Sequence, residues 1–323
     1  MIENKVKEKT KFFGTKLLSV LIIVFGLTFI AFCLSYLCPS DPVELQIESM
    51  GMVPTEELVS ATKESLGLNR PFIVQYFSWL WNFICGDMGN SLLTGKPVFQ
   101  EIMLYLPNTL ILTLTSMVTT MIFSIILGVI CAVNVNSVFD YAVRVITYFF
   151  ASFPGFFLAL LLLYIFSIRY NLFPVISTVD AKGMILPVSL LTFTMSAHYI
   201  RQIRAIVLEQ LNRDYVTGCK ARGIPAYVIL FRHVLKNSLV PIITLMGISF
   251  GGLLGGSAIV ENIFTWPGLG KYALSAIQKL DYPIIQSYVV WMALIYLAVN
   301  LLVDVFCVIV NPRVQNETEG SVV

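Results

Sequence analysis

The sequence predicts an all-α integral membrane protein with six transmembrane helices and with both termini in the cytoplasm. Three observations lead to this fold class. Of the 323 residues, 57% are hydrophobic and only 12% are charged, whereas a soluble domain usually carries roughly 25% charged residues. The apolar residues gather in runs of about 20, which is the length that a helix needs to cross a bilayer. The Lys and Arg residues are distributed unequally between the segments that connect these runs.

Six runs have the length and composition of membrane spans. The expected spans are 14–37, 106–133, 142–168, 183–208, 239–260 and 285–310. The first run follows five lysines, as a signal peptide would, but it is longer than a signal peptide's apolar region and no small-residue cleavage site follows it. We therefore expect it to be retained as a span.

The orientation follows from the Lys and Arg residues, which are enriched in cytoplasmic segments of membrane proteins. With a cytoplasmic N-terminus, the inner segments hold five, one, seven and one of these residues, and the outer segments hold the other seven of the 21. This bias favours both ends on the inside. Arg201 and Arg204, at the cytoplasmic exit of the fourth span, are explained by snorkelling of their long side chains toward the interface.

These spans divide the chain into an N-terminal part, an outer loop, a core and a tail. The expected parts are the cytoplasmic N-terminus and first span (1–37), an extracellular loop with short helices (38–105), a five-span core (106–313) and a cytoplasmic tail (314–323). In the outer loop, residues 55–66 predict a short helix capped by Thr55, and the aromatic residues of 72–84 favour the membrane interface, packing on the spans, or both. Cys38 and Cys85 both fall on this outer side and are candidates for a disulfide.

The polar stretch 209–238, between the fourth and fifth spans, is the most informative segment of the core. Its sequence predicts a short helix from Tyr215 to Arg222, a break at Gly223 and Pro225, and a second helical run that leads into the fifth span. A short helix held between two membrane helices could act as a stiff lever for a soluble partner. Its basic residues could equally contact anionic lipid.

A family resemblance bears on this choice. The stretch carries Asp214-Tyr215-Val216, Lys220-Ala221-Arg222-Gly223, Phe231-Arg232-His233, Asn237 and Pro241. This pattern resembles the cytoplasmic "EAA" loop of bacterial ABC importer permeases, and more narrowly that of the dipeptide/oligopeptide/nickel permease family. Thr217 stands where that loop has its glutamate, and Gly218 and Cys219 stand where it has alanines.

Further segments resemble the same family along nearly the whole chain. They are Gly86-Asp87-Met88-Gly89-Asn90-Ser91, Leu106-Pro107-Asn108-Thr109, Ser152-Phe153-Pro154, Pro267-Gly268-Leu269-Gly270, Asp281-Tyr282-Pro283 and Asn311-Pro312-Arg313. The resemblance implies a type I ABC importer permease fold in the bacterial inner membrane. It implies three kinds of protein partner: a second homologous permease, two ABC ATPase subunits that bind ATP and Mg, and an external solute-binding lipoprotein. It also implies contact with membrane lipid. This chain itself would bind no cofactor, metal or nucleic acid and would catalyse no reaction.

The resemblance implies which residues couple to the ATPases, and the residue types themselves, with the resemblance, suggest candidates for the pathway. The residues expected to couple to the ATPases are Asp214, Tyr215, Thr217, Gly218, Cys219, Ala221, Arg222, Gly223, Arg232, His233 and Asn237. The candidates for the pathway or its gating are Gly251, Gly252, Gly255, Gly256, Glu261 and Asp304. The glycines could also serve static helix packing, Glu261 could be a solvated helix end, and Asp304 could anchor one helix to another.

The function that the resemblance implies is ATP-driven import of a small solute, with short peptides preferred and nickel or a metal–metallophore complex as the alternative. An ion-coupled secondary transporter is the alternative class, and it would need acidic residues or broken helices near the bilayer midplane. An intramembrane enzyme would need a nucleophile and a base, or a metal motif. The sequence contains no GxxxxGK[ST], HExxH or GxSxG motif, which argues against a nucleotide site of its own and against two hydrolase classes.

Overall fold

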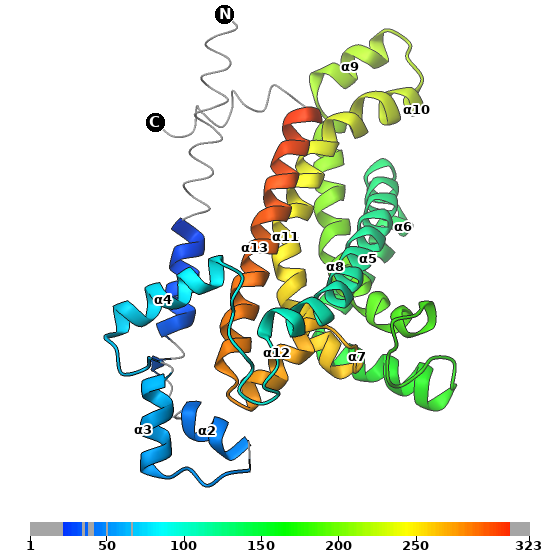
Figure 1. The fold of residues 1–323 in the computed structure, drawn as a ribbon. Coiled ribbons are helices and arrows are strands. Elements are labelled where there is room, and N and C mark those ends of the chain that lie inside the picture. The colour runs from blue at the N-terminus through cyan, green and yellow to red at the C-terminus, as the bar shows by residue number, and fades with distance from the viewer. Residues whose placement is uncertain (1–21, 34–35, 38–41, 50, 66, 311–323) are drawn as a thin grey trace, which may run out of the picture. The chain divides into compact units, whose positions relative to one another are not determined.

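The computed structural model describes residues 22–33, 36–37, 42–49, 51–65 and 67–310. These residues form helices and connecting turns, with one isolated bridge between Asn90 and Pro97 (Figure 1). The predicted all-α fold class is therefore confirmed. The chain divides into two compact units, Met1–Pro107 with Tyr272–Leu297 and Asn108–Lys271 with Ala298–Val323, which are described separately below.

Within the described part of the chain, four helical stretches are long and apolar enough to cross a membrane. They are α5 (Val98–Val133), α8 (Ala181–Leu211), the continuous stretch Ala226–Ile263, and Tyr282–Cys307 within α13 (Tyr282–Val310). They contain most of the expected second, fourth, fifth and sixth spans. Of the expected first span, the structure describes an apolar helix, Ile22–Cys33, that is shorter than a full crossing. The count of six crossings and the cytoplasmic placement of the termini stay predictions.

The expected third span is not a single straight helix. It is divided into α6 (Val138–Ser152), α7 (Gly155–Leu162) and a π-helical turn, η1 (Leu163–Arg169), with a bend of 98° after α6. Pro154 lacks an N–H, and a proline pushes the preceding residue out of the helical region. Phe153 is accordingly extended, with φ −93° and ψ 140°. Hydropathy predicted a span here but not its bend, so the crossing at 142–168 stays a prediction.

In the larger unit, α8 is the central helix and packs against α6, α7 and α11 (Leu235–Ile263). One apolar cluster joins the middle of α8 to α7 and to the far end of α11, through residues such as Leu190, Phe264 and Trp266. A second cluster joins the last turns of α8 to the start of α11, through Ile203, Val207 and Val234. The two clusters hold the two ends of this helix bundle.

In the smaller unit, the helix Ile22–Cys33 packs against α4 (Phe72–Ile84) through aromatic rings. Tyr76 of α4 is 1% exposed, and its hydroxyl lies 2.9 Å from the hydroxyl of Thr28. Phe72 and Tyr76 thus pack on the neighbouring helix, whereas Trp81 is 67% exposed. Packing therefore accounts for part of this aromatic segment, and its place at the membrane interface stays a prediction. The unit also contains α2 (Pro42–Ser49), α3 (Glu56–Ser65) and most of α12 (Leu269–Gln278).

The outer loop predicted from the sequence contains a capped helix and a family-like turn. The helix expected at 55–66 is present as α3, and the N–H of Leu58 donates to the Thr55 hydroxyl at 3.4 Å, so the predicted cap is confirmed. Cys38 lies outside the described residues, so its pairing with Cys85 stays a prediction. The family-like segment that ends at Ser91 folds onto Asp281, because the Ser91 hydroxyl and the Leu92 N–H both donate to that carboxylate.

Candidate functional site

The short helix expected in the polar stretch is present as α9 (Asp214–Ala221). Asp214 lies in its first turn and Lys220 in its last, where each charge opposes the partial charge of the helix end. The Tyr215 hydroxyl donates to Oε1 of Gln210 on α8 at 3.1 Å. The helix lies beyond the ends of α8 and α11, where it forms a hairpin with the following segment (Figure 1).

A glycine turn ends this helix as the sequence predicts. Gly223 has φ +72°, a conformation that costs a residue with a side chain roughly 1–2 kcal/mol. Its N–H donates to the carbonyl of Lys220 at 2.9 Å, and the N–H of Ile224 donates to the carbonyl of Cys219 at 3.2 Å. This pair of bonds is the Schellman arrangement, which satisfies the free carbonyls at a helix end and requires the left-handed residue.

The second helical run is joined to the fifth span without a break. It consists of α10 (Ala226–Val228), the π-helical η2 (Ile229–Val234) and α11. Arg232 and His233 lie in η2, and single π-turns of this kind are often found at functional positions. Arg232 is exposed and His233 is half-buried, while Asn237 is exposed on the first turns of α11.

One side of the α9 hairpin packs against the bundle, and its other side, called the open side below, is exposed. Val216 is 1% exposed and packs with Val207 of α8 and Ile229 of η2 in the second apolar cluster. The remaining expected coupling residues of α9 and its turn lie mostly on the open side. Exposed there are Asp214, Thr217, Gly218, Ala221, Arg222 and Gly223, and half-buried are Tyr215 and Cys219. The structure thus leaves most of the expected coupling residues of α9 and its turn exposed, on a helix held in place by Val216, while Arg232, His233 and Asn237 lie on η2 and α11.

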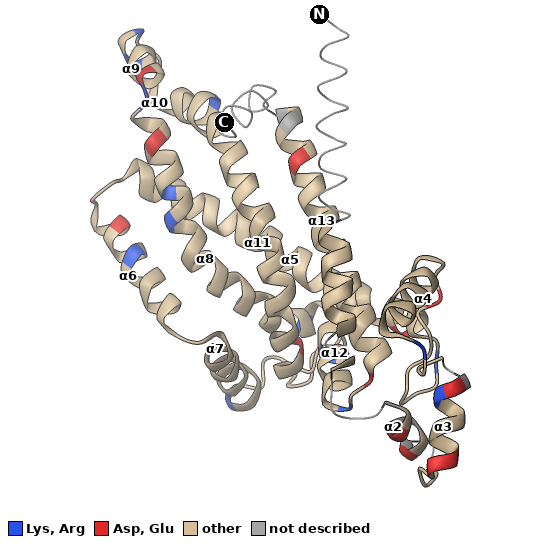
Figure 2. Cartoon of the chain, turned by 90° about the vertical axis from the view of Figure 1, so that its left-hand side faces the viewer, with Lys and Arg blue, Asp and Glu red and all other residues tan. Residues whose placement is uncertain are grey.

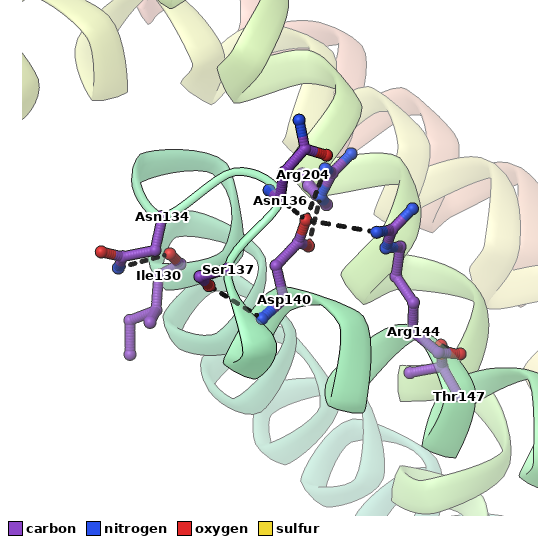
Figure 3. A network of polar contacts seen from close by, with 8 residues as sticks. All are labelled: Ile130, Asn134, Asn136, Ser137, Asp140, Arg144, Thr147 and Arg204. Carbon is purple, nitrogen blue, oxygen red and sulfur yellow. Dashed lines mark hydrogen bonds and ion pairs between the residues drawn. The ribbon is translucent and has the colours of Figure 1, made fainter.

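Between α6 and α8 the structure contains an ion pair with a buried carboxylate, which the sequence analysis did not predict (Figures 2 and 3). Asp140 of α6 is 0% exposed and receives two bonds from Arg204 of α8, from Nε at 2.7 Å and from an Nη at 2.8 Å. The N–H of Asn136 also donates to this carboxylate at 3.0 Å, and Arg144 lies 3.7 Å from it. Arg204 is therefore an ion-pair partner, and its interpretation as a snorkelling anchor was wrong.

A local sequence signal for half of this pair does exist. Ser137 caps α6 and its side chain accepts from the N–H of Asp140, so a serine followed three residues later by an acidic residue marks the helix start. This signal predicts the helix and the position of the carboxylate. It does not predict the arginine, which lies 64 residues away in the sequence.

Glu261, near the end of α11, is buried rather than solvated. Its side chain is 0% exposed and accepts from the Thr109 hydroxyl at 2.7 Å and from the Lys271 N–H at 2.9 Å. A Cβ on Gly268 would come within 2.5 Å of the Glu261 carboxyl group, and one on Gly270 within 2.9 Å. The family-like segment Pro267–Gly270 thus carries glycines where this carboxylate packs, and the expectation of a solvated helix end was wrong.

The glycines of α11 differ among themselves. A Cβ on Gly247 would collide with Val303 at 2.7 Å, so this glycine allows close packing within the chain. A Cβ on Gly252, Gly255 or Gly256 would meet nothing within 4 Å, and these three residues are exposed in the described chain. Their face of α11 also carries Ile248 and Ile259, which are 64% and 55% exposed. Gly251 and Asp304 are each half-buried, on α11 and α13.

Among the described residues, no group of three or more His, Cys, Asp or Glu side chains could hold a metal ion. Outside the spans, Asp180 caps α8 by accepting from the Gly183 N–H at 2.9 Å. The Thr178 hydroxyl and this N–H hold the pKa of the Asp180 carboxyl below its usual value. In the smaller unit, burial and the nearby Glu101 raise the pKa of the Tyr272 hydroxyl.

Two family models match the sequence. Residues 124–316 match "Binding-protein-dependent transport system inner membrane component", and residues 9–113 match the N-terminal model of the same kind of membrane component.

Individual proteins match along nearly their whole length. The metal-staphylopine import system permease protein CntB of Staphylococcus aureus is 34% identical over 94% of this chain and 98% of its own. The oligopeptide transport system permease protein AppB of Bacillus subtilis is 34% identical over 91% and 95%. The glutathione transport system permease protein GsiC of Escherichia coli is 33% identical over 93% and 97%.

A solved structure supports the fold. A chain of the MetNI methionine ABC transporter, in an inward-facing conformation, superimposes with a TM-score of 0.55 over 65% of this chain and 96% of that chain. At 16% sequence identity this likeness concerns the fold alone, which is that of a type I ABC importer permease.

Proposed function

Because this chain belongs to the family of binding-protein-dependent transport system inner membrane components, we propose that it forms half of the translocation pathway of an ATP-driven importer. Members of this family are permease subunits of ABC importers and are multi-pass proteins of the bacterial inner membrane. The observation that carries the proposal is the α9 hairpin, which is firmly seated by Val216 and exposes the family-like residues on its other side.

In this proposal two ATPase subunits bind ATP and Mg and receive α9 on the cytoplasmic side. Closure of the ATPases around ATP displaces α9, and the displacement changes the bundle from inward-facing to outward-facing. Hydrolysis then resets it. ATP can drive this change only because it binds one of the two states of the complex more tightly than the other. This chain contributes the lever and the pathway but no covalent chemistry.

A second, homologous permease would supply the other half of the pathway. The exposed glycine face of α11, formed by Gly252, Gly255 and Gly256, supports this arrangement, because small residues let helices from two chains approach closely. Gly251, Glu261 and Asp304 remain the other candidates for pathway or gating positions. An external lipoprotein would deliver the solute to the outer side.

The solute proposed is a di- or oligopeptide, since two of the relatives named above are permeases for an oligopeptide and for glutathione, itself a peptide. Import of nickel or of a metal–metallophore complex is the alternative, which the metal-staphylopine permease favours. Mass spectrometry of the ligand that copurifies with the cognate binding protein distinguishes them. We expect a short peptide, and a metal chelate would contradict the peptide proposal.

The importer proposal is tested by reconstitution into proteoliposomes. With the second permease, both ATPases and the binding protein, we expect solute uptake that needs ATP and that continues when ionophores collapse the ion gradients. Uptake by this chain alone, driven by a proton gradient, would show an ion-coupled transporter instead and would overturn the proposal.

A further inference from the structure

The attachment of α6 to α8 is unusual for a helix in an apolar bundle. The fully buried side chains of α6 are Asp140 and Thr147, both of which are polar. Large apolar side chains of this helix are turned outward, among them Val138 at 88% and Phe149 at 59% exposure. In lipid, apolar surfaces gain little by leaving the acyl chains for each other. The start of α6 is therefore held on α8 chiefly by polar contacts.

The Asp140–Arg204 pair provides a contact of defined geometry (Figure 3). Two parallel N–H···O bonds between a guanidinium and a carboxylate fix both the distance and the mutual rotation of the two groups. The N–H of Asn136 donates to the same carboxylate, and the Ser137 hydroxyl accepts from the backbone N–H of Asp140, so Asp140 is also tied to the α5–α6 turn. An apolar contact would permit the two helices to slide or turn, whereas this pair holds them in one register.

Arg204 is linked to α9 through its neighbours on α8. It lies between Ile203 and Val207, which are both 0% exposed and belong to the same apolar cluster as Val216 of α9. From Arg204 to Leu211, at the end of α8, the helix extends about 10 Å. The turn Asn212–Arg213 joins α9 to α8, and the packed cluster bridges the two helices beside this turn. A displacement of α9 therefore reaches Arg204 through the cluster and the last turns of α8.

We propose that the Asp140–Arg204 ion pair is a positioning joint that makes α6 follow α8 when α9 is displaced. The inference rests on the proposed function, because the ATPases supply the displacement. Neither residue touches the solute in this account. Their part is to keep the α5–α6 turn in register with the helix that carries the lever.

The test compares Asp140→Asn, Arg204→Met and the double variant in the complete reconstituted importer. Arg204→Met leaves the buried Asp140 carboxylate with only Arg144, 3.7 Å away, as a charged partner, and Asp140→Asn leaves the half-buried Arg204 guanidinium without a carboxylate. Both are therefore expected to lower the yield of folded complex. The double variant keeps neither charge of the pair, and the amide oxygen that replaces the carboxylate can still accept from the Asn136 N–H. We expect its melting temperature and ATPase rate to return toward wild type, while solute transported per ATP hydrolysed stays about tenfold lower.

Tyr148→Leu is the matched control. Arg201 lies 4.6 Å from the centre of the Tyr148 ring, so this change removes a contact between the same two helices and leaves the ion pair intact. It is expected to transport at the wild-type ratio. If the double variant regains both stability and the wild-type ratio of transport to hydrolysis, the pair is a stabilising contact only and the inference is overturned.

A second variant decides the case if the double variant does not assemble. Arg204→Lys keeps the positive charge but loses the two-pronged geometry, and we expect a lowered transport ratio in a folded complex. A wild-type ratio in Arg204→Lys would overturn the inference. If the wild-type complex itself shows no ATP-driven uptake, the proposed function is overturned. The inference about the ion pair, which rests on that function, is then overturned with it.

Discussion

At the residue scale, two glycines fix local geometry for different reasons. Gly223 has a positive φ and ends α9, and a Cβ there would meet nothing within 4 Å. Gly268 lies directly against the Glu261 carboxyl group. A side chain at the first position strains the backbone without a clash, whereas a side chain at the second collides with a buried carboxylate.

Replacement of Gly223 by Val tests whether the left-handed turn after α9 needs a glycine. We expect the protein to insert and assemble, because the position is open to solvent, but the turn after α9 should be strained by about 1–2 kcal/mol. ATP hydrolysis should then continue while transport per ATP falls. The measurement is the ratio of the two rates in proteoliposomes, with Gly155→Val as the control at another exposed glycine with open space around it. Normal transport by the Gly223 variant would count against the docking role of the hairpin.

Replacement of Gly268 by Ala tests whether a side chain at this position collides with the buried Glu261 carboxyl group. A Cβ 2.5 Å from the Glu261 carboxyl group has to displace a side chain that is bonded to Thr109 and Lys271, and overpacking of this kind costs about 1–3 kcal/mol. The melting temperature of the purified protein should fall. Gly256→Ala, inside α11 where a Cβ meets nothing within 4 Å, should not lower it, because alanine is favoured over glycine in a helix. A melting temperature of the Gly268 variant as high as that of the wild type would refute the packing role of Glu261.

At the scale of the element, helix ends determine where the chain turns. The start of α6 is capped by Ser137, that of α8 by Asp180, and α9 ends in a glycine turn. The cap of α6 positions Asp140, which pairs with Arg204 of α8. The cap of α8 makes the stability of that helix start depend on the ionisation of the Asp180 carboxyl group.

The Asp180 cap predicts a pH dependence at the start of α8. Because hydrogen bonds to the carboxylate lower its pKa in the folded protein, its stabilising effect is complete above the usual aspartate value near 4. This stabilising effect is lost as the pH falls through the lower pKa that Asp180 has in the folded protein. Asp180→Asn should remove this part of the dependence, so that the melting temperatures of wild type and variant converge between pH 5 and strongly acid conditions, on the order of pH 2. A constant difference over that range would exclude the ionised cap.

The elements differ in how far the sequence predicts them. Long apolar runs predict α5, α8, α11 and α13 because a span requires length and apolarity, and both are visible along the chain. The helix at α9 was predicted within one residue at each end, since Gly223 and Pro225 mark its limit. The bend after α6 was missed because hydropathy measures how apolar a segment is and does not predict the direction of its helix axis. Pro154 marks the position of the bend. The Asp140–Arg204 pair was missed because its partners meet only after two helices have packed.

At the scale of the whole molecule, the chain has surfaces that its described residues leave uncovered. The open side of α9 carries exposed polar and small residues, and one face of α11 carries exposed glycines between Ile248 and Ile259. Lipid can cover the second surface as well as a protein partner can. The account assigns α9 to an ATPase and the glycine face to a second permease.

The glycine face yields a prediction about assembly. Gly255→Leu should leave the fold of this chain intact, because a Cβ there meets nothing within 4 Å, but should block the close approach of a helix from the second permease. Copurification of the two permeases should fall severalfold. Gly155→Leu makes the same change at an exposed glycine of α7 and should copurify normally, and undiminished copurification of the Gly255 variant would place the second permease elsewhere.

The central claim is that α9 receives the ATPase, and site-specific photocross-linking tests it most directly. A photoreactive residue at Thr217, which is exposed on α9, is compared with one at Lys182, which is exposed at the opposite end of α8. In the assembled importer we expect an adduct with the ATPase subunit from position 217 and none from position 182. No ATPase adduct from position 217, or one from position 182, would contradict the account.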